Sequence, residues 1–311
     1  MTAAIEPAWL GEVVACALCG GTLAEQRRVG EGAGVLQCEA CRAPYPVIGT
    51  IAVLVPEPHV WMAAHRADIV ELLEGDRASL EVVDAFASSA PDEPAQPFVD
   101  DWLPGELTGE EWPDPPADYR ETFGRFIDEV GEWNPVRALL GLLGPDIGTT
   151  VEIGIGAGRL STSLLMRAGR LVIADLSLRT VLAVLERDRR YKKDTPRAAI
   201  IADAEQLPLR PGAVDFLAAA NLIDLLDDPA GFLAASAAAL RPGGRIGLVT
   251  PAPDLGDDTA GDGALDAALL AAGFVISDGH DQVPWLRAHR AREWQVYFTR
   301  IVVATRPPLD A

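Results

Sequence analysis

The sequence predicts an α/β protein in which helices cover both faces of a mainly parallel sheet, preceded by a small metal-binding ribbon. From Thr149 onward, short apolar runs alternate with helical patterns, as in sheets whose parallel strands are joined by crossover helices. All four cysteines of the 311 residues lie within the first 41. We therefore predict a ribbon at 1–57, a helix with an acidic, proline-rich linker or lid at 58–118, and the α/β domain at 119–311.

The cysteines have the spacing of a zinc ribbon. Cys16 and Cys19 form one C-x2-C pair, and Cys38 and Cys41 form a second pair eighteen residues later. A reducing compartment favours metal binding over disulfides, although redox use of the thiols stays open. Four thiolates leave no open coordination position, so the predicted zinc is structural. The apolar run 47–55 after the second pair predicts a strand.

The middle of the chain changes composition abruptly. Residues 59–86 have helical periodicity, whereas residues 78–119 contain no Lys or Arg and collect acids and prolines, which indicates a linker or mobile lid. Helical periodicity returns at 119–143. Aromatic residues at 119–133, with His59, Trp61 and His65, suggest a lid over a ligand, but such a pattern also fits a helix core.

The remaining elements follow in order. Strands are predicted at 149–154, 170–175, 198–202, 213–219, 244–250, 273–278 and 295–305. Helices are predicted between most of them, at 161–168, 178–190, 229–240 and 264–272.

A glycine turn after the first of these strands is the strongest sign of a ligand site. Glu152 is followed by Gly154, Gly156 and Gly158 and then by a helix, whose free N–H groups favour an anion. Neither the dinucleotide fingerprint nor a Walker loop fits, because Arg159 and Ser161 stand where glycine or alanine would be needed and no Gly-Lys-Ser/Thr follows.

Acidic residues also end the next two strands. Asp175 stands seventeen residues after Gly158, where a carboxylate can accept from both ribose hydroxyls, and Asp203 can accept from an adenine amino group. In a doubly wound sheet the carboxyl ends of the strands meet at the ligand crevice. The three acids are therefore predicted to bind one ligand.

These motifs resemble those of class I S-adenosylmethionine-dependent methyltransferases over roughly residues 120–305. The further matching elements are the Asp203-Ala204 pair, the strand at 213–217 followed by Asn221, and the Pro-Gly-Gly segment at 242–244. The resemblance implies a Rossmann-like seven-stranded sheet, mostly parallel with an antiparallel last strand, and S-adenosylmethionine as cofactor. The cofactor residues that it implies are Glu152, Gly154, Gly156, Gly158, Asp175, Leu176, Asp203, Ala204 and Asn221.

The ribbon and the segment after it resemble the small zinc-binding subunit that activates certain tRNA, rRNA and translation-factor methyltransferases. In this chain the module would be fused to the domain, where it either regulates the domain or only packs against it.

Substrate contacts are expected in the connection between the last two strands, which would hang over the methyl group. His280 and His289 are candidate bases there, and Asp224 is a third candidate after the fourth strand. The candidate substrate-binding residues are Trp285, Arg287, Arg290 and Arg292. Their arginines would bind a carboxylate or phosphate, unless the segment is only a solvated helix.

Charge guides the choice of partner. With 26 basic and 46 acidic residues the net charge is −20, which repels nucleic acids and anionic membranes. We therefore expect a cytoplasmic enzyme, with neither a secretory signal nor a membrane span, that methylates O or N of a small molecule or peptide. Two alternatives stay open: an rRNA or tRNA methyltransferase, since some rRNA enzymes also carry a preceding zinc module, and a non-catalytic module that senses the cofactor.

Overall fold

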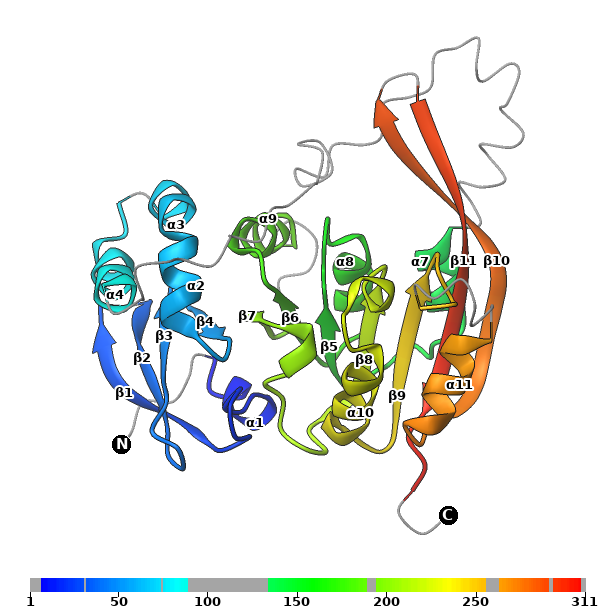
Figure 1. Cartoon of the computed structure of the whole chain (residues 1–311), viewed down its shortest axis with the longest axis horizontal. Coiled ribbons are helices and arrows are strands. Elements are labelled where there is room, and N and C mark those ends of the chain that lie inside the picture. The colour runs from blue at the N-terminus through cyan, green and yellow to red at the C-terminus, as the bar shows by residue number, and fades with distance from the viewer. Residues whose placement is uncertain are drawn as a thin grey trace.

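One mixed sheet of eleven strands runs through the molecule in the order β1-β2-β3-β4-β7-β6-β5-β8-β9-β11-β10 (Figure 1). The computed structural model describes residues 7–30, 32–73, 75–88, 134–188, 194–255, 263–290 and 293–308. The predicted linker at 89–118 and the predicted helix at 119–133 lie outside these residues. Among the described helices, none combines the length and the apolar character that a bilayer crossing requires.

The centre of the sheet confirms the predicted alternation. Its strands are β5 (Thr149–Ile153), β6 (Arg170–Asp175), β7 (Arg197–Ala202), β8 (Val214–Ala220) and β9 (Leu240–Thr250), and neighbours among them pair in parallel. β11 (Glu293–Thr305) is antiparallel to both β9 and β10 (Val275–Arg290), as the prediction of an antiparallel last strand required.

Helices cover both faces of the central strands. They are α7 (Pro135–Gly141), α8 (Arg159–Leu165), α9 (Leu178–Asp188), α10 (Pro229–Ala239) and α11 (Ala264–Ala271). Alternate residues of β6 belong to two separate buried clusters, Val172 to the one that includes α10 and α11 and Leu171 to the one that includes α8 and α9. This alternation arises because successive strand residues point to opposite faces.

The N-terminal module continues the same sheet, so the seven strands predicted for the α/β domain, β5 to β11, are extended by four more. α1 (Leu10–Val13) precedes β1 (Leu23–Val29), β2 (Ala33–Cys38), β3 (Pro44–Ile48) and β4 (Ile51–Leu54). The single strand predicted at 47–55 is split by Gly49 and Thr50, which both have positive φ and turn the chain into the β3–β4 hairpin. β4 then pairs in parallel with β7, which would otherwise be a sheet edge.

The single helix predicted at 59–86 is three helices, α2 (Pro58–Ala64), α3 (Arg66–Leu72) and α4 (Arg77–Ala87). Gly75, at φ 89°, lies in the break before α4. Asp76 then caps α4 by accepting from the Ser79 N–H at 3.2 Å. The apolar periodicity continues across these breaks because the three helices pack on one side of the hairpin strands.

The largest correction concerns residues 280–293, predicted as a connection with a solvated helix as the alternative. Residues 280–290 continue β10 and Glu293 begins β11, with Arg290 paired to Glu293; residues 291–292 lie outside the described residues. Pro284 masked the strand pattern, but β10 is the outermost strand, where proline is tolerated. β9 ends at Thr250, opposite Arg300, so the hairpin beyond this level forms an arm past the carboxyl ends of the parallel strands (Figure 1).

Candidate functional site

The glycine turn between β5 and α8 is shaped by its glycines. Gly154, Gly156 and Gly158 have φ of 66°, 48° and 67°, a region that other residues adopt rarely. A Cβ on Gly154 would lie 2.9 Å from Leu222 Cδ1, so this position also lacks space. The turn is held to β6 because the Gly154 N–H donates to the Ala174 carbonyl at 2.9 Å.

Glu152 is a buried carboxyl group beside this turn. The residue is 1% exposed, and its Oε2 has no hydrogen-bond partner among the described residues. Burial raises the pKa of Glu152 to about 8; the nearby Asp188 acts in the same direction, whereas Ser161 and Arg187 lower it. Leaving a buried polar atom unpaired is costly, so a ligand cation or donor at this position would satisfy a group that the fold leaves without a partner.

Asp175 lies at the end of β6, facing the turn. Its Oδ2 accepts from the Gly156 N–H at 3.3 Å, and its Oδ1 accepts from the Ser177 N–H at 2.9 Å. The carboxylate is therefore oriented by two backbone groups, one of which belongs to the glycine turn itself. Leu176, the next residue, accepts at its carbonyl from the indole N–H of Trp61 in α2, at 3.2 Å.

Asp203 follows β7 and begins a short 3-10 helix at Ala204–Gln206. Its Oδ1 accepts from the Glu205 N–H at 2.9 Å, and Ala204 is buried. Because β5, β6 and β7 are parallel neighbours, Glu152, Asp175 and Asp203 all stand at the carboxyl edge of the sheet. This is the edge where doubly wound sheets bind ligands.

The fourth strand end contributes Asn221 and Asp224. Asn221 has φ of 53°, and its side-chain Oδ1 is buried without a partner among the described residues. Asp224 instead accepts from the Thr250 hydroxyl at 2.8 Å, a contact that ties the end of β8 to the end of β9. The geometry therefore gives Asp224 a structural partner, while Asn221 retains an unused acceptor.

Arg187, at the end of α9, also contacts the glycine turn and was not predicted from the sequence. Its guanidinium donates to the carbonyls of Ala157 and Gly158, from the side of the turn that α9 covers. A Cβ on Gly158 would lie 2.4 Å from Val184 Cγ2, so this glycine admits α9 as well as shaping the turn. An arginine inside an amphipathic helix is no local signal of such a role, because only the packing of α9 brings it to the turn.

Two of the predicted lid residues, Trp61 on α2 and His65 at its end, are core residues, whereas His59 is half-buried. Trp61 and His65 are both buried, and their rings stack with centroids 4.4 Å apart. His65 Nδ1 lies 2.9 Å from the Trp61 carbonyl oxygen. The aromatic spacing therefore reflects packing of α2 against the sheet, although Trp61 also reaches the loop after Asp175.

The arm carries the predicted substrate residues. His280 pairs with Ile301, which lies opposite Val249 near the end of β9. Trp285 pairs with Tyr297, and their ring centroids are 5.1 Å apart. Arg287, His289 and Arg290 belong to β10 by their backbone. Arg292 lies outside the described residues.

The four cysteines converge into one cluster. The Sγ atoms of Cys16, Cys19, Cys38 and Cys41 all lie within 4.8 Å of one another. The Cys16–Cys41 and Cys19–Cys38 sulfur pairs are 3.6 and 3.5 Å apart. A zinc ion bound tetrahedrally at about 2.3 Å from each sulfur would require edges of about 3.8 Å. The cluster therefore fits a four-thiolate zinc ion with little rearrangement.

Neighbouring polar groups contact the cysteine sulfurs and favour metal binding. Burial acts to raise the pKa of the Cys38 thiol, but the N–H groups of Cys41 and Ala40 donate to its sulfur and lower that pKa to about 7. The Tyr45 hydroxyl lies 3.0 Å from Cys16 Sγ. Such donors to sulfur are the usual outer contacts of structural zinc sites.

Comparison with known proteins finds several similar sequences and structures. Residues 151–248 match the family model of a methyltransferase domain. An uncharacterised methyltransferase of Mycobacterium tuberculosis is 31% identical over 162 residues, which cover 49% of this chain and 63% of the relative. Among solved structures, an S-adenosylmethionine-dependent methyltransferase of Aquifex aeolicus is 16% identical, with 66% of this chain and 99% of that chain covered and a TM-score of 0.45.

Another similar structure is a chain of the complex between the Haloferax volcanii Trm112 methyltransferase activator and a methyltransferase. It is 16% identical, with 61% of this chain and 96% of that chain covered and a TM-score of 0.45. This chain spans 63% of the length of the curated relatives that it matches.

Residues 151–248 are therefore similar to a methyltransferase domain. The matched residues contain the glycine turn, Asp175, Asp203 and Asn221.

Proposed function

We propose that this protein is an S-adenosylmethionine-dependent methyltransferase that acts on oxygen or nitrogen of a small molecule or a peptide. The proposal rests on the buried Oε2 of Glu152, which lies beside the glycine turn at the carboxyl ends of the strands and has no hydrogen-bond partner within the described part of the chain. The amine of the cofactor would supply the missing donor. Asp175 and Asp203 stand at the two neighbouring strand ends, where ribose and adenine would extend.

The protein's own part in this reaction is to bind and orient. Asp175 would accept from the ribose hydroxyls, and Asp203 with the Ala204 N–H would read adenine. When bound, S-adenosylmethionine supplies an electrophilic methyl group. Placing an acceptor in line with that group can account for much of the acceleration without a dedicated base. Asn221 Oδ1, buried and without a partner among the described residues, would be available to line the reacting methyl.

Calorimetry with S-adenosylhomocysteine tests the proposal directly. We expect one molecule to bind per zinc-loaded chain, followed by transfer of labelled methyl from S-adenosylmethionine to a small-molecule or peptide fraction. If neither compound binds, the proposal is wrong. Binding without transfer to any fraction would favour the non-catalytic alternative, and transfer only to RNA would favour the nucleic-acid alternative.

Asp175→Asn is expected to weaken S-adenosylhomocysteine binding by about one to two decades. A hydrogen bond to a charged carboxylate contributes about 1.5 to 3 kcal/mol, and asparagine keeps one oxygen for the Ser177 N–H but loses the charge. Asp266→Asn is the matched control, since Asp266 on α11 pairs with Arg300 on β11, remote from the turn. Equal affinities of the two variants would exclude Asp175 as a ribose ligand.

If the acceptor is anionic, Arg287→Ala is expected to raise its KM with little change in the affinity for S-adenosylhomocysteine. The net charge of −20 makes a cationic arm the natural place to hold an anion. Steady-state kinetics with the acceptor found in the labelled-methyl experiment would measure this effect. Arg290→Ala and Arg292→Ala should act in the same direction, and an unchanged KM in all three variants would remove the arm from the acceptor site.

A further inference from the structure

We propose that the N-terminal zinc-binding module, residues 10–54, is part of the cofactor site. It holds the loop at residues 203–207, here called the adenine loop, at both ends, and each of these two attachments is called a clamp. Zinc and S-adenosylmethionine would then bind cooperatively. This inference rests on the proposed function for the identity of the ligand. It gives the module a role in positioning the adenine loop, a role that the sequence left open.

The first clamp is the pairing of β4 with β7. Their parallel register ends with Leu54 opposite Ala202, the residue directly before Asp203. All four residues of β4 are buried, and Leu54 is fully covered. The position of Asp203 is thus fixed by a strand that belongs to the N-terminal module.

The second clamp lies just after the loop. Val14 forms a bridge with Leu209, and the Ala15 N–H donates to the Pro208 carbonyl at 2.8 Å. Arg210 adds two bonds, from its N–H to the Val13 carbonyl at 2.8 Å and from its side-chain Nε to the Val14 carbonyl at 3.0 Å. The residues directly before and after the adenine loop are therefore paired with or hydrogen-bonded to the module.

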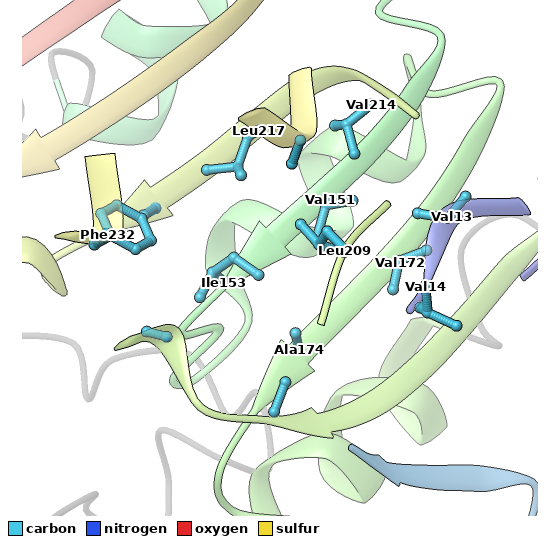
Figure 2. Packing of buried hydrophobic residues seen from close by; sticks show 14 of the residues in the cluster. Val13, Val14, Val151, Ile153, Val172, Ala174, Leu209, Val214, Leu217 and Phe232 are labelled. Atoms are coloured by element: carbon cyan, nitrogen blue, oxygen red, sulfur yellow. The ribbon is translucent and has the colours of Figure 1, made fainter. Parts of the chain in front are cut away.

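Side-chain packing reinforces the second clamp. Figure 2 shows Val13 and Val14 beside Leu209 and Val172, within the buried cluster of the central sheet. Val14 is fully buried, and Ala204 of the adenine loop belongs to the same cluster. A shift of the N-terminal segment would therefore open this core next to the loop, at a cost in contact area.

The cysteine cluster connects the two clamps. Cys16 directly follows Ala15, so it anchors the second clamp, whereas Cys38 ends β2 and Cys41 lies just before β3. β2 pairs with β3, and β3 pairs with β4, which makes the first clamp. One ion bound by all four sulfurs would hold both clamps in a single geometry.

Linkage makes the consequence measurable in both directions. If zinc orders the clamps and the clamps order the adenine loop, zinc must strengthen cofactor binding, and cofactor must strengthen zinc binding by the same factor. Couplings between distinct sites are typically about 5-fold to 150-fold in affinity.

The experiment uses the full zinc-loaded chain. Zinc loss to a chromogenic chelator is timed with and without saturating S-adenosylhomocysteine, and we expect the ligand to slow the release by about fivefold or more. In parallel, calorimetry compares Arg210→Ala with wild type. The variant loses one charged hydrogen bond to the Val14 carbonyl, so we expect about threefold to tenfold weaker S-adenosylhomocysteine binding and faster zinc release.

Arg306→Ala is the matched control. Arg306 also donates to backbone carbonyls, those of Ala238 and Leu240, but it ties the residue after β11 to the end of α10 and the start of β9. This variant should leave both measurements unchanged. If wild type binds S-adenosylhomocysteine but zinc release is unaffected by it, and Arg210→Ala behaves like Arg306→Ala, the inference is wrong although the proposed function stands. If Arg210→Ala fails to fold, the wild-type release rates alone decide. Absence of any binding to the zinc-loaded wild type would instead overturn the proposed function.

Discussion

Replacing Cys38 with serine is expected to abolish stoichiometric zinc binding and to unfold the strands at residues 23–54. Cys38 is fully buried, and its sulfur lies 3.5 Å from Cys19 Sγ. The apparent free energy of binding to structural zinc sites is on the order of 10 to 16 kcal/mol, comparable to the total stability of a domain. Because β4 is embedded in the core, we expect the loss to lower the Tm of the whole chain by more than about 10 °C.

Metal analysis and thermal unfolding measure these two effects together. Tyr45→Phe is the graded control, because it removes only the hydroxyl 3.0 Å from Cys16 Sγ and keeps the buried ring. It should retain one zinc per chain with a small loss of stability. Full zinc occupancy and an unchanged Tm in Cys38→Ser would show that the cluster is not a structural metal site.

Glu152→Gln is expected to stabilise the ligand-free protein at alkaline pH while weakening its affinity for the cofactor. The folded-state pKa of about 8 lies above the ordinary value of 4.5, so the folded protein holds a proton that the unfolded chain releases. Its stability therefore falls as pH rises from about 4.5 to 8, by up to about 1.4 kcal/mol per unit. Glutamine stays neutral and avoids this loss.

Cofactor binding should shift the protonation of Glu152 in the opposite direction, toward the ionised carboxylate. A cationic amine beside Glu152 favours the ionised carboxylate, so binding near pH 7 should release close to one proton in wild type and none in Glu152→Gln. Calorimetry in buffers of different ionisation enthalpy counts this proton. We expect the variant to bind at least about tenfold more weakly, as the loss of one charged hydrogen bond implies.

Asp188→Asn is the matched control for Glu152→Gln. Asp188 is also buried, and burial raises its pKa, but its Oδ1 accepts from the Thr162 hydroxyl on α8 at 2.8 Å. Because Asp188 also acts to raise the pKa of Glu152, this variant should reduce the proton release without abolishing it, and it should not weaken the affinity. A Glu152→Gln protein that binds as tightly as wild type would mean that the unpartnered oxygen does not face the ligand.

Much of the candidate site was predictable because its signals are local. The cysteine spacing, the glycine turn and the acids that end β6 and β7 each lie within one element or at its boundary. The parallel sheet then brings separate strand ends to one edge, which follows from topology alone. The sequence could not show that Asp224 bonds to Thr250, or that Trp61 packs in the core and donates to Leu176.

Strand boundaries were least predictable where a proline or charges interrupt the pattern. Pro284 and the arginines around it suggested a loop, yet pairing with β11 carries β10 through them. In the same way, the run at 47–55 gave no sign of the hairpin turn at Gly49 and Thr50. Cross-strand partners override weak local preference, and those partners are distant in sequence.

Local sequence specifies which groups are available: four thiolates at metal spacing, a backbone turn that only glycine adopts easily, and carboxylates at strand ends. Tertiary contacts specify how these groups are joined, through the pairing of β4 with β7, the bonds of Arg210 to the N-terminal segment and the contact of Arg187 with the turn. The difference is one of distance along the chain. Backbone conformation and ligand spacing depend on neighbouring residues, whereas these contacts join segments far apart in the chain and exist only after the core has packed.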